Sequence, residues 1–376
     1  MSLLMKNIIT NRTKHIISKN SILYITQRNL SFAPSIYDGD KDPAPKFFSS
    51  NVQNLLKRLT RPDYAKVFRK RTNVEQDVLE SPRYKFLTDE ELEAEMGKTH
   101  IKAEKLLQMP PVVKVQTPIN DVIAEDPALI GYDTAKYMFT DITFGVDNAH
   151  RIIVERDVDG TLRSCDHDVR KRLNQVYFPM NGRKIREPLM FLDLEKLEKL
   201  LDSKKYEFVL DRACIQYEPA EPTYQKITSI TYQHVDRKNF YDMLRSTRHF
   251  GPLVFYLAWH QSIDGLLLEM LQTEVVREAA LLVALRHAIL DDVVDGNIAN
   301  ELAQQILSTP VQLKKQTELT EEDIRLDNRC IEVVEKYIVR NSSMRGQQEL
   351  ALQGFREHYH QLVELSRGLK KAHGTA

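Results

Sequence analysis

The sequence predicts an α+β protein built from an extended N-terminal arm with short helices, a small mixed α+β domain and a C-terminal α-helical domain. Three observations predict this order. Apolar residues recur at helical spacing in residues 51–60, alternate with polar residues in 136–144, and return to helical spacing after residue 263. The expected parts are a leader at 1–30, the arm at 31–111, the α+β domain at 112–235 and the helical domain at 236–376.

The first 30 residues have the composition of a mitochondrial transit peptide. They contain five cations and no Asp or Glu, and paired apolar residues recur between the cations. On a helix this spacing gives one apolar face and one basic, hydroxyl-rich face, as in mitochondrial targeting sequences. We predict cleavage after Leu30, in RNLS at 28–31, and a mature protein in the mitochondrial matrix. The alternative is a basic tail that stays attached.

The charge balance argues against a protein that coats nucleic acid through bulk charge. The chain has 53 basic and 53 acidic residues, so removal of the five cations of the leader leaves a net charge near −5. A protein that binds RNA through bulk charge is basic overall. Contact with RNA therefore requires local basic patches, and much of the surface should meet other proteins or water.

The arm is expected to combine an extended segment with short helices. Residues 31–50 contain three prolines and few apolar anchors, which favours an extended chain. NVQNLLKRLT at 51–60 predicts a helix that ends at Pro62, and Asp63 is placed to cap the next one.

A longer helix is predicted to follow TDEEL at 88–92. This sequence is a capping box, in which Thr88 caps the helix and Glu91 stands three residues later. Acidic residues fill the first turn and lysines lie toward the end, which matches the helix dipole. The pair Pro110–Pro111 should end the helix.

The α+β domain is predicted to begin with strands. KYMFTDITF at 136–144 alternates and is rich in β-branched and aromatic residues, and RIIVER at 151–156 followed by Asp159–Gly160 predicts a hairpin. FVLDRACIQYE at 208–218 and TYQKITSITY at 223–232, separated by a proline-containing segment, are predicted as two further strands.

Two helices and a turn are expected between these strands. A helix is predicted at 166–178 with Asp166 as its cap, and another at 193–206. Asn181–Gly182 predicts a tight turn between them.

The helical domain follows from apolar spacing after residue 236. A single long helix is predicted from near Ile263, and further amphipathic helices around 297–308, 320–340 and 344–370. No apolar run approaches the ~20 residues that a membrane helix needs, so no membrane span is predicted. The apolar face of the long helix comprises Leu267, Leu271, Val275, Ala279 and Leu282.

Two groups of cations are candidates for contact with RNA or with an acidic partner. The larger group is opposed only by Asp63 and is interleaved with Tyr64 and Phe68. Lys and Arg neutralise phosphates, and an aromatic ring can stack on a base or pack on a partner. The alternative is a solvated helix face. The larger group is Lys57, Arg58, Arg61, Lys66, Arg69, Lys70 and Arg71, and the smaller group, next to the Asn181–Gly182 turn, is Arg183, Lys184 and Arg186.

DDVVDG at 291–296 is the one segment that invites an enzymatic interpretation. Asp291, Asp292 and Asp295 have the DDxxD spacing that holds Mg²⁺ and a diphosphate in isoprenoid synthases, but no second acidic motif is apparent. An EF-hand is excluded because Val293 and Leu302 occupy ligand positions. A capped helix end with an acidic turn is the preferred interpretation.

No other metal, cofactor or catalytic signature is found in the sequence. The three cysteines are far apart and form no CxxC pair, and His358 and His360 are spaced so that they point to different helix faces. There is no GxSxG, Walker loop, HExxH or GxGxxG motif. The sequence therefore predicts no cofactor, no metal, no small-molecule substrate and no catalytic chemistry, and Trp259 is expected to belong to the core.

Long, unusual stretches in a fixed order carry a resemblance to a known family. Over residues 105–290 the chain closely resembles the mitochondria-specific family of small-subunit ribosomal protein number twenty-two. The stretches are KLLQMPPVV at 105–113, PINDVIAED at 118–126, KYMFTDITF at 136–144, NQVYFPMNGRKI at 174–185, YDMLRSTRHFG at 241–251 and IDGLLLEML at 263–271.

The resemblance implies a structural protein of the mitochondrial ribosome. Members of this family have no bacterial counterpart, lie in the lower body of the small subunit, and touch neighbouring mitochondria-specific proteins and, locally, the ribosomal RNA. No catalytic residue or cofactor can be carried over. Within the matching stretches, Arg183 and Lys184 of GRK and Arg245 and Arg248 of RSTR are the first candidates for RNA or acidic-partner contact.

Two alternatives stay open at the level of the sequence. The chain could be a matrix adaptor or assembly factor that visits ribosomes transiently, or a Mg²⁺-dependent matrix enzyme that uses DDVVDG. Neither alternative accounts for the matching stretches.

Overall fold

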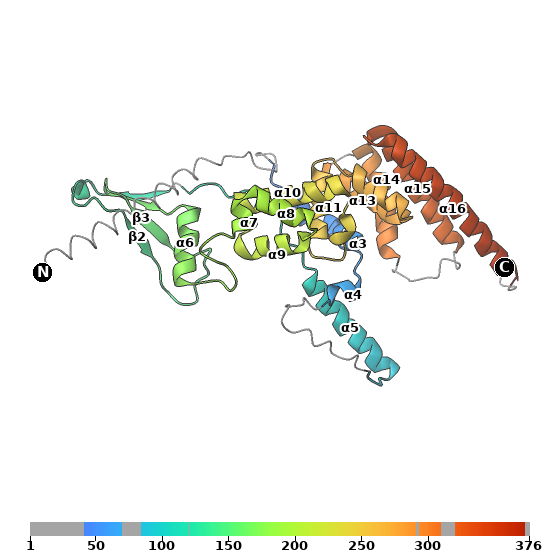
Figure 1. Ribbon diagram of the computed structural model, residues 1–376, viewed down its shortest axis with the longest axis horizontal. Helices are drawn as coiled ribbons and strands as arrows, with labels where there is room; N and C mark the ends of the chain where they lie inside the picture. The colour runs from blue at the N-terminus through green and yellow to red at the C-terminus, as the bar shows by residue number, and fades with distance from the viewer. Residues whose placement is uncertain (1–40, 70–83, 120, 291–292, 310–319, 373–376) are drawn as a thin grey trace. The chain divides into compact units, whose positions relative to one another are not determined.

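The computed structural model describes residues 41–69, 84–119, 121–290, 293–309 and 320–372. The predicted leader at 1–30 and residues 31–40 of the segment predicted as extended lie outside these residues. Within them the chain forms a series of α-helices and one four-stranded sheet (Figure 1). The predicted α+β class with a helical C-terminal region is confirmed. The predicted domain boundaries at 111 and 235 stay predictions.

The first described helices belong to the core of the helical part of the chain. They are α2 (Ala44–Phe47) and α3 (Ser50–Thr60). Ser49 caps α3 by accepting a hydrogen bond from the Val52 amide. Phe47 packs edge-on against Phe255, with ring centroids 5.2 Å apart. The apolar face of α3 is buried against α11 (Phe250–Trp259) and α13 (Val276–Leu290), and it consists of Val52, Leu55, Leu56 and Leu59.

Two helices follow, α4 (Tyr64–Val67) and α5 (Asp89–Leu106). The predicted capping box is confirmed, because Thr88 accepts from the Glu91 amide and the Glu91 carboxylate accepts from the Thr88 amide. Ala103, near the C-terminal end of α5, is the only buried residue of this helix.

The sheet is antiparallel with strand order β1-β4-β3-β2. The predicted hairpin between β3 and β4 is confirmed. Gly160 closes its turn with φ +84°, and a Cβ atom there would lie 2.1 Å from the Asp126 carbonyl oxygen, so only glycine fits. The strands are β1 (Val122–Glu125), β2 (Tyr137–Thr140), β3 (Ile153–Arg156) and β4 (Thr161–Ser164).

The predicted helices around the tight turn are also confirmed. Asp166 caps α6 (His167–Tyr177), and the turn places Gly182 at φ +81°. The next helices are α7 (Leu189–Leu192) and α8 (Leu194–Asp202).

The two further strands predicted at 208–218 and 223–232 are wrong, because both segments are helical. They form α9 (Tyr206–Gln216) and α10 (Pro222–Lys238). In α9 the buried residues Val209, Leu210 and Ala213 lie on one helix face. Burial of that face outweighs the β-propensity of single residues, which is a weak preference.

The β-branched residues of α10 misled the prediction for a physical reason. A buried threonine hydroxyl needs a hydrogen-bond partner, and a helix offers one in the carbonyl one turn earlier. Thr228 donates to the Tyr224 carbonyl at 3.0 Å, and Thr231 donates to the Ile227 carbonyl at 2.8 Å. Pro222 also starts the helix at the position where proline is best tolerated.

The single long helix predicted from Ile263 is two helices, α12 (Asp264–Gln272) and α13 (Val276–Leu290). Glu274 takes a left-handed conformation with φ 61° between them. Its amide bonds to the Leu271 carbonyl, and the Val275 amide bonds to the Met270 carbonyl. This Schellman arrangement ends a helix without interrupting its apolar spacing, so the apolar pattern alone did not reveal the break.

The C-terminal helices match their predicted positions. They are α14 (Val293–Ser308), α15 (Glu321–Asn341) and α16 (Arg345–Ala372), preceded by the apolar α11 (Phe250–Trp259). Trp259 is half-buried and stacks on Phe255, as expected for a core residue. Helices α15 and α16 lie side by side (Figure 1).

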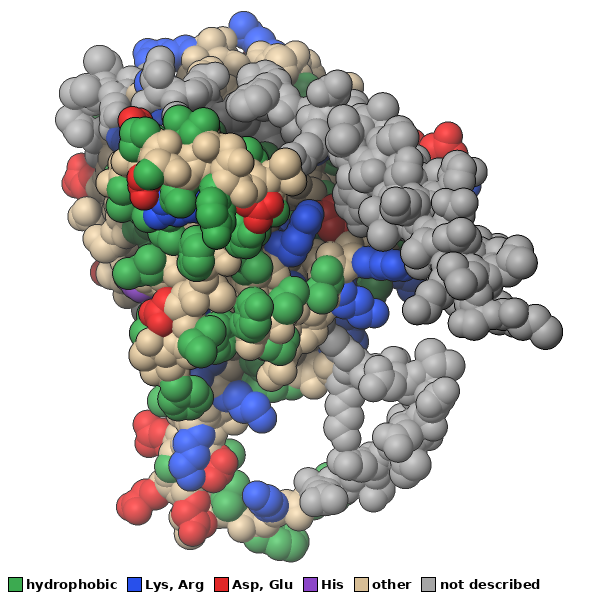
Figure 2. Space-filling model, turned by 90° about the vertical axis from the view of Figure 1, so that its left-hand side faces the viewer, with side chains coloured by type: hydrophobic (Ala, Val, Ile, Leu, Met, Phe, Trp, Pro, Cys, Tyr) green, Lys and Arg blue, Asp and Glu red, His purple; other side chains and the backbone are tan. Residues whose placement is uncertain are grey.

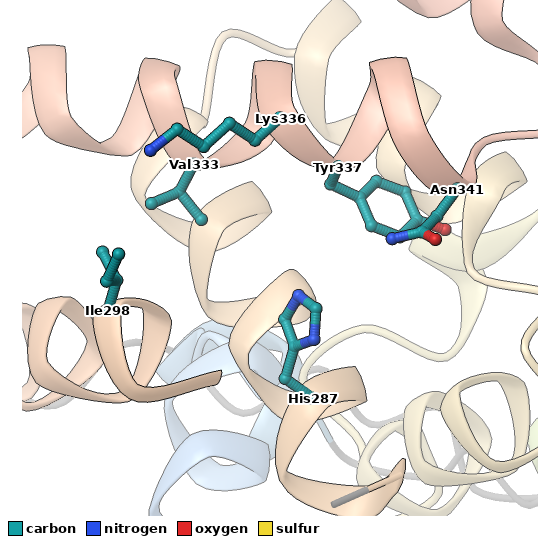
Figure 3. A pocket seen from close by; sticks show the side chains of 6 residues that line it. All are labelled: His287, Ile298, Val333, Lys336, Tyr337 and Asn341. Carbon is teal, nitrogen blue, oxygen red and sulfur yellow. The ribbon is translucent and has the colours of Figure 1, made fainter. Parts of the chain in front are cut away.

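A small cavity of about 20 Å³ lies among α13, α14 and α15, where His287, Ile298 and Tyr337 are among its lining residues (Figure 3). A cavity of this size has room for about one water molecule and is too small for an organic ligand.

Candidate nucleic-acid interface

The structure brings cations from distant parts of the chain around one cleft. Lys66 and Arg69 come from α4 and the residues after it, Lys102 from α5, and Arg248 from the segment that precedes α11. Together with Phe68 they line a concave site of about 400 Å³. We call the site formed by these five residues the basic cleft.

Local sequence builds the wall of the basic cleft at α4. Arg61 ends α3 in a left-handed conformation with φ 49°, and Pro62 prevents the helix from continuing. Asp63 then caps α4 by accepting from the Ala65 amide at 2.9 Å. Tyr64 and Phe68, four residues apart, stack with centroids 6.3 Å apart and an interplanar angle of 9°.

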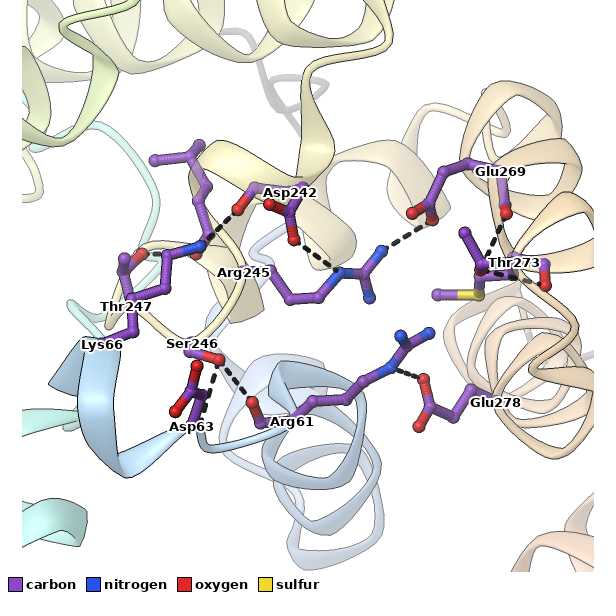
Figure 4. Close-up of polar contacts among 12 residues, drawn as sticks. Arg61, Asp63, Lys66, Asp242, Arg245, Ser246, Thr247, Glu269, Thr273 and Glu278 are labelled. Atoms are coloured by element: carbon purple, nitrogen blue, oxygen red, sulfur yellow. Dashed lines mark hydrogen bonds and ion pairs between the residues drawn. The ribbon is translucent and has the colours of Figure 1, made fainter. Parts of the chain in front are cut away.

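A hydrogen-bonded joint holds α4 against the 242–247 segment (Figure 4). Ser246 has a left-handed φ of 62°, and its amide donates to the Thr60 carbonyl at 3.0 Å. Its hydroxyl donates to the Arg61 carbonyl and accepts from the Asp63 amide. The Lys66 ammonium donates to the Asp242 carbonyl at 2.5 Å. These contacts bring Lys66 to the segment that carries Arg248.

Two of the predicted contact residues, the half-buried Arg61 and the buried Arg245, pair with carboxylates of their own chain. Arg61 pairs with Glu278, and Arg245 is 5% exposed and lies 2.6 Å from Glu269 (Figure 4). Burial, and then repulsion from Arg245, lowers the pKa of Arg61 to about 10. The expectation of RNA or acidic-partner contact at Arg245 is therefore corrected, because its guanidinium is buried against a carboxylate of its own chain.

Arg248 is oriented by a buried carboxylate. Asp211 accepts from Arg248 at 2.7 Å and from the Nε2 atom of His249 at 2.9 Å. Burial lowers the pKa of His249, although its hydrogen bond to Asp211 opposes this shift. The side chain of Arg248 is 35% exposed, so it is anchored at its inner side and open toward the cleft.

Positive charge dominates the described lining of the basic cleft. Four cationic side chains face one carboxylate, Glu207, which lies 2.9 Å from Arg69. Lys102 lies over the Phe68 ring, 5.7 Å from its centroid, and has no carboxylate partner within the described residues. An aromatic ring stabilises a cation without neutralising it. The cleft can thus bind an anionic group.

Of the remaining cations of the larger predicted group, the two that the structure describes, Lys57 and Arg58, do not line the cleft. Lys57 is exposed on α3, and Arg58 is half-buried, where burial and the neighbouring Arg277 lower its pKa. Lys70 and Arg71 lie outside the described residues.

The smaller predicted group contains one buried side chain and two exposed ones. The Arg183 side chain is 8% exposed, and it donates to the Ile215 carbonyl and pairs with Glu218, each at 3.4 Å. Lys184 and Arg186 are exposed, and neither has a carboxylate partner in the described part of the chain.

The DDVVDG segment at 291–296 is not tested by the structure. Asp291 and Asp292 lie outside the described residues, and the side chain of Asp295 is likewise not described. Among the side chains that are described, no group of three His, Cys, Asp or Glu residues could hold a metal ion. His358 pairs with Glu274 at 2.8 Å, as expected for a surface histidine. None of the described helices is both long and apolar enough to span a bilayer.

Sequence reasoning missed the role of Lys102. We interpreted the lysines of this helix as complements to its dipole, and nothing in the local sequence distinguishes Lys102 from its neighbours. Its position opposite Phe68 depends on how α5 meets α4, which no short-range pattern encodes.

Comparison with known proteins identifies the family. The sequence model of the family described as mitochondrial 28S ribosomal protein S22 matches residues 45–291. The chain is 38% identical over 262 residues to the small ribosomal subunit protein mS22 of Bos taurus, an alignment that covers 69% of this chain and 70% of the bovine protein. The small ribosomal subunit protein mS22 of Mus musculus is also 38% identical over 262 residues, with the same coverage of 69% and 70%. The resemblance found in the sequence is confirmed, and the chain belongs to the family of mitochondrial 28S ribosomal protein S22.

Proposed function

We propose that this chain is a structural component of the small subunit of the mitochondrial ribosome, in the mitochondrial matrix, and that it supports mitochondrial translation without catalytic chemistry of its own. The observation that carries this proposal is the family match over residues 45–291, which includes every residue of the basic cleft. Its partners are the other proteins of the small subunit and, locally, its ribosomal RNA.

Exposed apolar side chains around the sheet support contact with other proteins. Both outer strands are exposed along their whole length or nearly so. Figure 2, which turns the left-hand side of Figure 1 toward the viewer, shows hydrophobic side chains spread over this face. Apolar patches of this kind mark interaction surfaces in soluble proteins. We call the following residues the sheet patch: Val122, Ile123, Tyr137, Met138, Phe139, Ile142, Phe144 and Ile152.

The distribution of basic residues supports local contact with RNA. The whole chain is balanced in charge, so bulk attraction to phosphates is weak. The basic cleft and the exposed side chains of Lys57, Lys184 and Arg186 are among the described places at which cations are accessible. A component of a large ribonucleoprotein particle is expected to contact RNA at separate basic sites and to contact proteins between those sites.

Sedimentation tests the proposal against the adaptor alternative. A tagged form of the chain is expressed in mitochondria, and the lysate is separated on sucrose gradients at moderate and high salt. We expect the chain to migrate with the small subunit at near-equal stoichiometry and to stay there at high salt. A free pool, or association only with incomplete precursors, would instead identify an assembly factor.

The enzymatic alternative is tested on the same material. Asp291, Asp292 and Asp295 are replaced together by Asn, which removes the carboxylates that Mg²⁺ would need. We expect the variant to enter the small subunit as the unmodified chain does. If the purified chain converts a substrate in the presence of Mg²⁺ and the variant does not, the enzymatic alternative is supported instead.

A further inference from the structure

The shape of the basic cleft restricts what can enter it. The site is concave, with a volume of about 400 Å³, which lies in the range of pockets that hold small organic ligands. A nucleic-acid duplex presents its phosphates on a convex surface, so its bases stay out of reach of the cleft walls. An unpaired nucleotide can turn into such a site, because its base is free of a partner strand.

The cations of the cleft are held in place but are not fully neutralised by their own chain. Lys66 donates to a carbonyl oxygen rather than to a carboxylate, and Lys102 faces an aromatic ring. Arg248 shares Asp211 with a second donor, His249. Ser246 and Thr247 also line the site, but their hydroxyl groups donate to the Arg61 and Leu244 carbonyl oxygens, so the cations are the donors of the cleft. This set of cationic donors suits the oxygen atoms of a phosphate.

The other walls of the cleft are flat and apolar. Phe68 contributes its ring, and Val67, Leu106 and Leu107 contribute aliphatic side chains. Tyr64, stacked parallel to Phe68, is 46% exposed and extends the aromatic surface beyond the cleft. A carboxylate of an acidic peptide would use the cations and leave these walls uncovered. A nucleobase would cover them, because every base has an apolar π-face.

We infer that the basic cleft binds an unpaired nucleotide of RNA, with the phosphate held by Lys66, Arg69, Lys102 and Arg248 and the base packed against Phe68. This inference rests on the proposed ribosomal function and assigns one RNA-binding site within it. The phosphate supplies affinity that depends on salt, and the base supplies the preference for single strands.

Binding to short RNA by the purified full-length chain tests the inference. Fluorescence anisotropy compares a labelled single-stranded RNA of about 10 nucleotides, a length within the usual range for such sites, with a duplex of the same sequence. We expect tighter binding of the single strand. An acidic peptide of equal charge is the third probe. Equal or tighter binding of either the duplex or the peptide would overturn the inference.

Two substitutions locate the binding in the basic cleft. Lys102→Glu should weaken single-strand binding and lower the slope of log Kd against log salt by about 0.7 for each phosphate that the variant no longer neutralises. Phe68→Ala should weaken binding by roughly fivefold to a hundredfold, the range measured for loss of one base–aromatic stack. Phe68→Trp should retain binding, which separates loss of stacking from loss of folding.

Lys226→Glu, at an exposed site on α10 outside the cleft lining, is the matched charge control. It should leave single-strand binding nearly unchanged. An equal loss in Lys102→Glu and Lys226→Glu would show that binding reflects bulk charge and would overturn the inference. Sedimentation of the same variants keeps the two proposals apart. If the chain enters the small subunit but Lys102→Glu and Phe68→Ala leave its RNA affinity unchanged, only the cleft assignment is disproved. If the unmodified chain never enters the subunit, the proposed function is disproved.

Discussion

The hydroxyl group of Ser246 donates a hydrogen bond to the carbonyl oxygen of Arg61, which lies 185 positions earlier in the chain. Both residues have left-handed backbone conformations, with φ of 62° and 49°. The contact joins the end of α3 to the segment before α11, and the two sides of the basic cleft depend on it. The positions of the cleft cations therefore depend on a hydrogen bond in which no cationic side chain of the cleft takes part.

Replacing the joint hydroxyl should destabilise the protein. Ser246→Ala leaves the Asp63 amide and the Arg61 carbonyl without their partner, so we expect the free energy of unfolding to fall by about 1–3 kcal/mol. Ser246→Gly should cost less, because glycine relieves the left-handed conformation. Urea unfolding measures both. Equal stability of the unmodified chain and Ser246→Ala would show that the joint contributes nothing.

Truncation of α3 tests whether this helix belongs to the core. Leu55 is fully buried, so Leu55→Ala should lower the free energy of unfolding by about 2–5 kcal/mol, because less apolar surface is buried and a cavity remains. Leu92→Ala on α5 is the control, since Leu92 is 48% exposed and should change stability by less than about 0.5 kcal/mol. Similar small effects at both positions would mean that α3 is a loosely attached arm.

His249 should make stability depend on pH. Burial lowers its pKa below the ordinary value of 6.5, so over this pH range the unfolded chain binds a proton that the folded protein does not. The free energy of unfolding should therefore decrease as the pH falls from about 7.5 through 6.5, by at most about 1.4 kcal/mol per pH unit. Below the pKa of the folded state this contribution stops changing.

His249→Gln provides the control for this pH dependence. Glutamine keeps an N–H donor for Asp211 but does not titrate. Urea unfolding at pH 7.5 and pH 5.5 should show a smaller difference for the variant than for the unmodified chain. The same difference in both proteins would assign the pH dependence to other groups.

Arg245 and Lys184 should respond differently to truncation, although both belong to the stretches that resemble the family. Arg245→Ala leaves Glu269 without its buried partner, so the free energy of unfolding should fall by about 3 kcal/mol. This value is the lower end of the range for buried ion pairs, because Glu269 keeps some access to solvent. Lys184→Ala should change stability by less than about 0.5 kcal/mol. Thermal unfolding compares them, and a stable Arg245→Ala variant would contradict the internal role of this side chain.

A polar residue in the sheet patch should disturb assembly more than folding. Phe144 is 98% exposed, so Phe144→Asp should change the free energy of unfolding by less than about 0.5 kcal/mol. If a protein partner covers the patch, the variant should enter the small subunit less efficiently in sucrose gradients. Leu350→Asp on α16, where Leu350 is 72% exposed, controls for loss of any exposed apolar side chain. Equal incorporation of both variants would mean that Phe144 meets no partner.

Elements with local signals could be predicted from the sequence. Thr88 and Glu91 satisfy each other's backbone groups within one helical turn, and Gly160 supplies the only backbone conformation that its hairpin turn allows. Where the local signals conflicted, the prediction was wrong. The β-branched residues of α10 favour a strand by propensity, but their hydroxyls bond to the preceding helical turn and their neighbours bury one helix face.

The basic cleft could be predicted only in its parts. Charge and aromatic content marked Lys66 and Arg69, and the family resemblance marked Arg248, but the sequence could not show which cations would stay accessible. That depends on long-range pairing. Glu278 pairs with the half-buried Arg61 and Glu269 with the buried Arg245, while packing of α5 brings Lys102 to Phe68. Coulomb energy and desolvation act through distances in space, so residues far apart along the chain acquire their roles only when the fold brings them together.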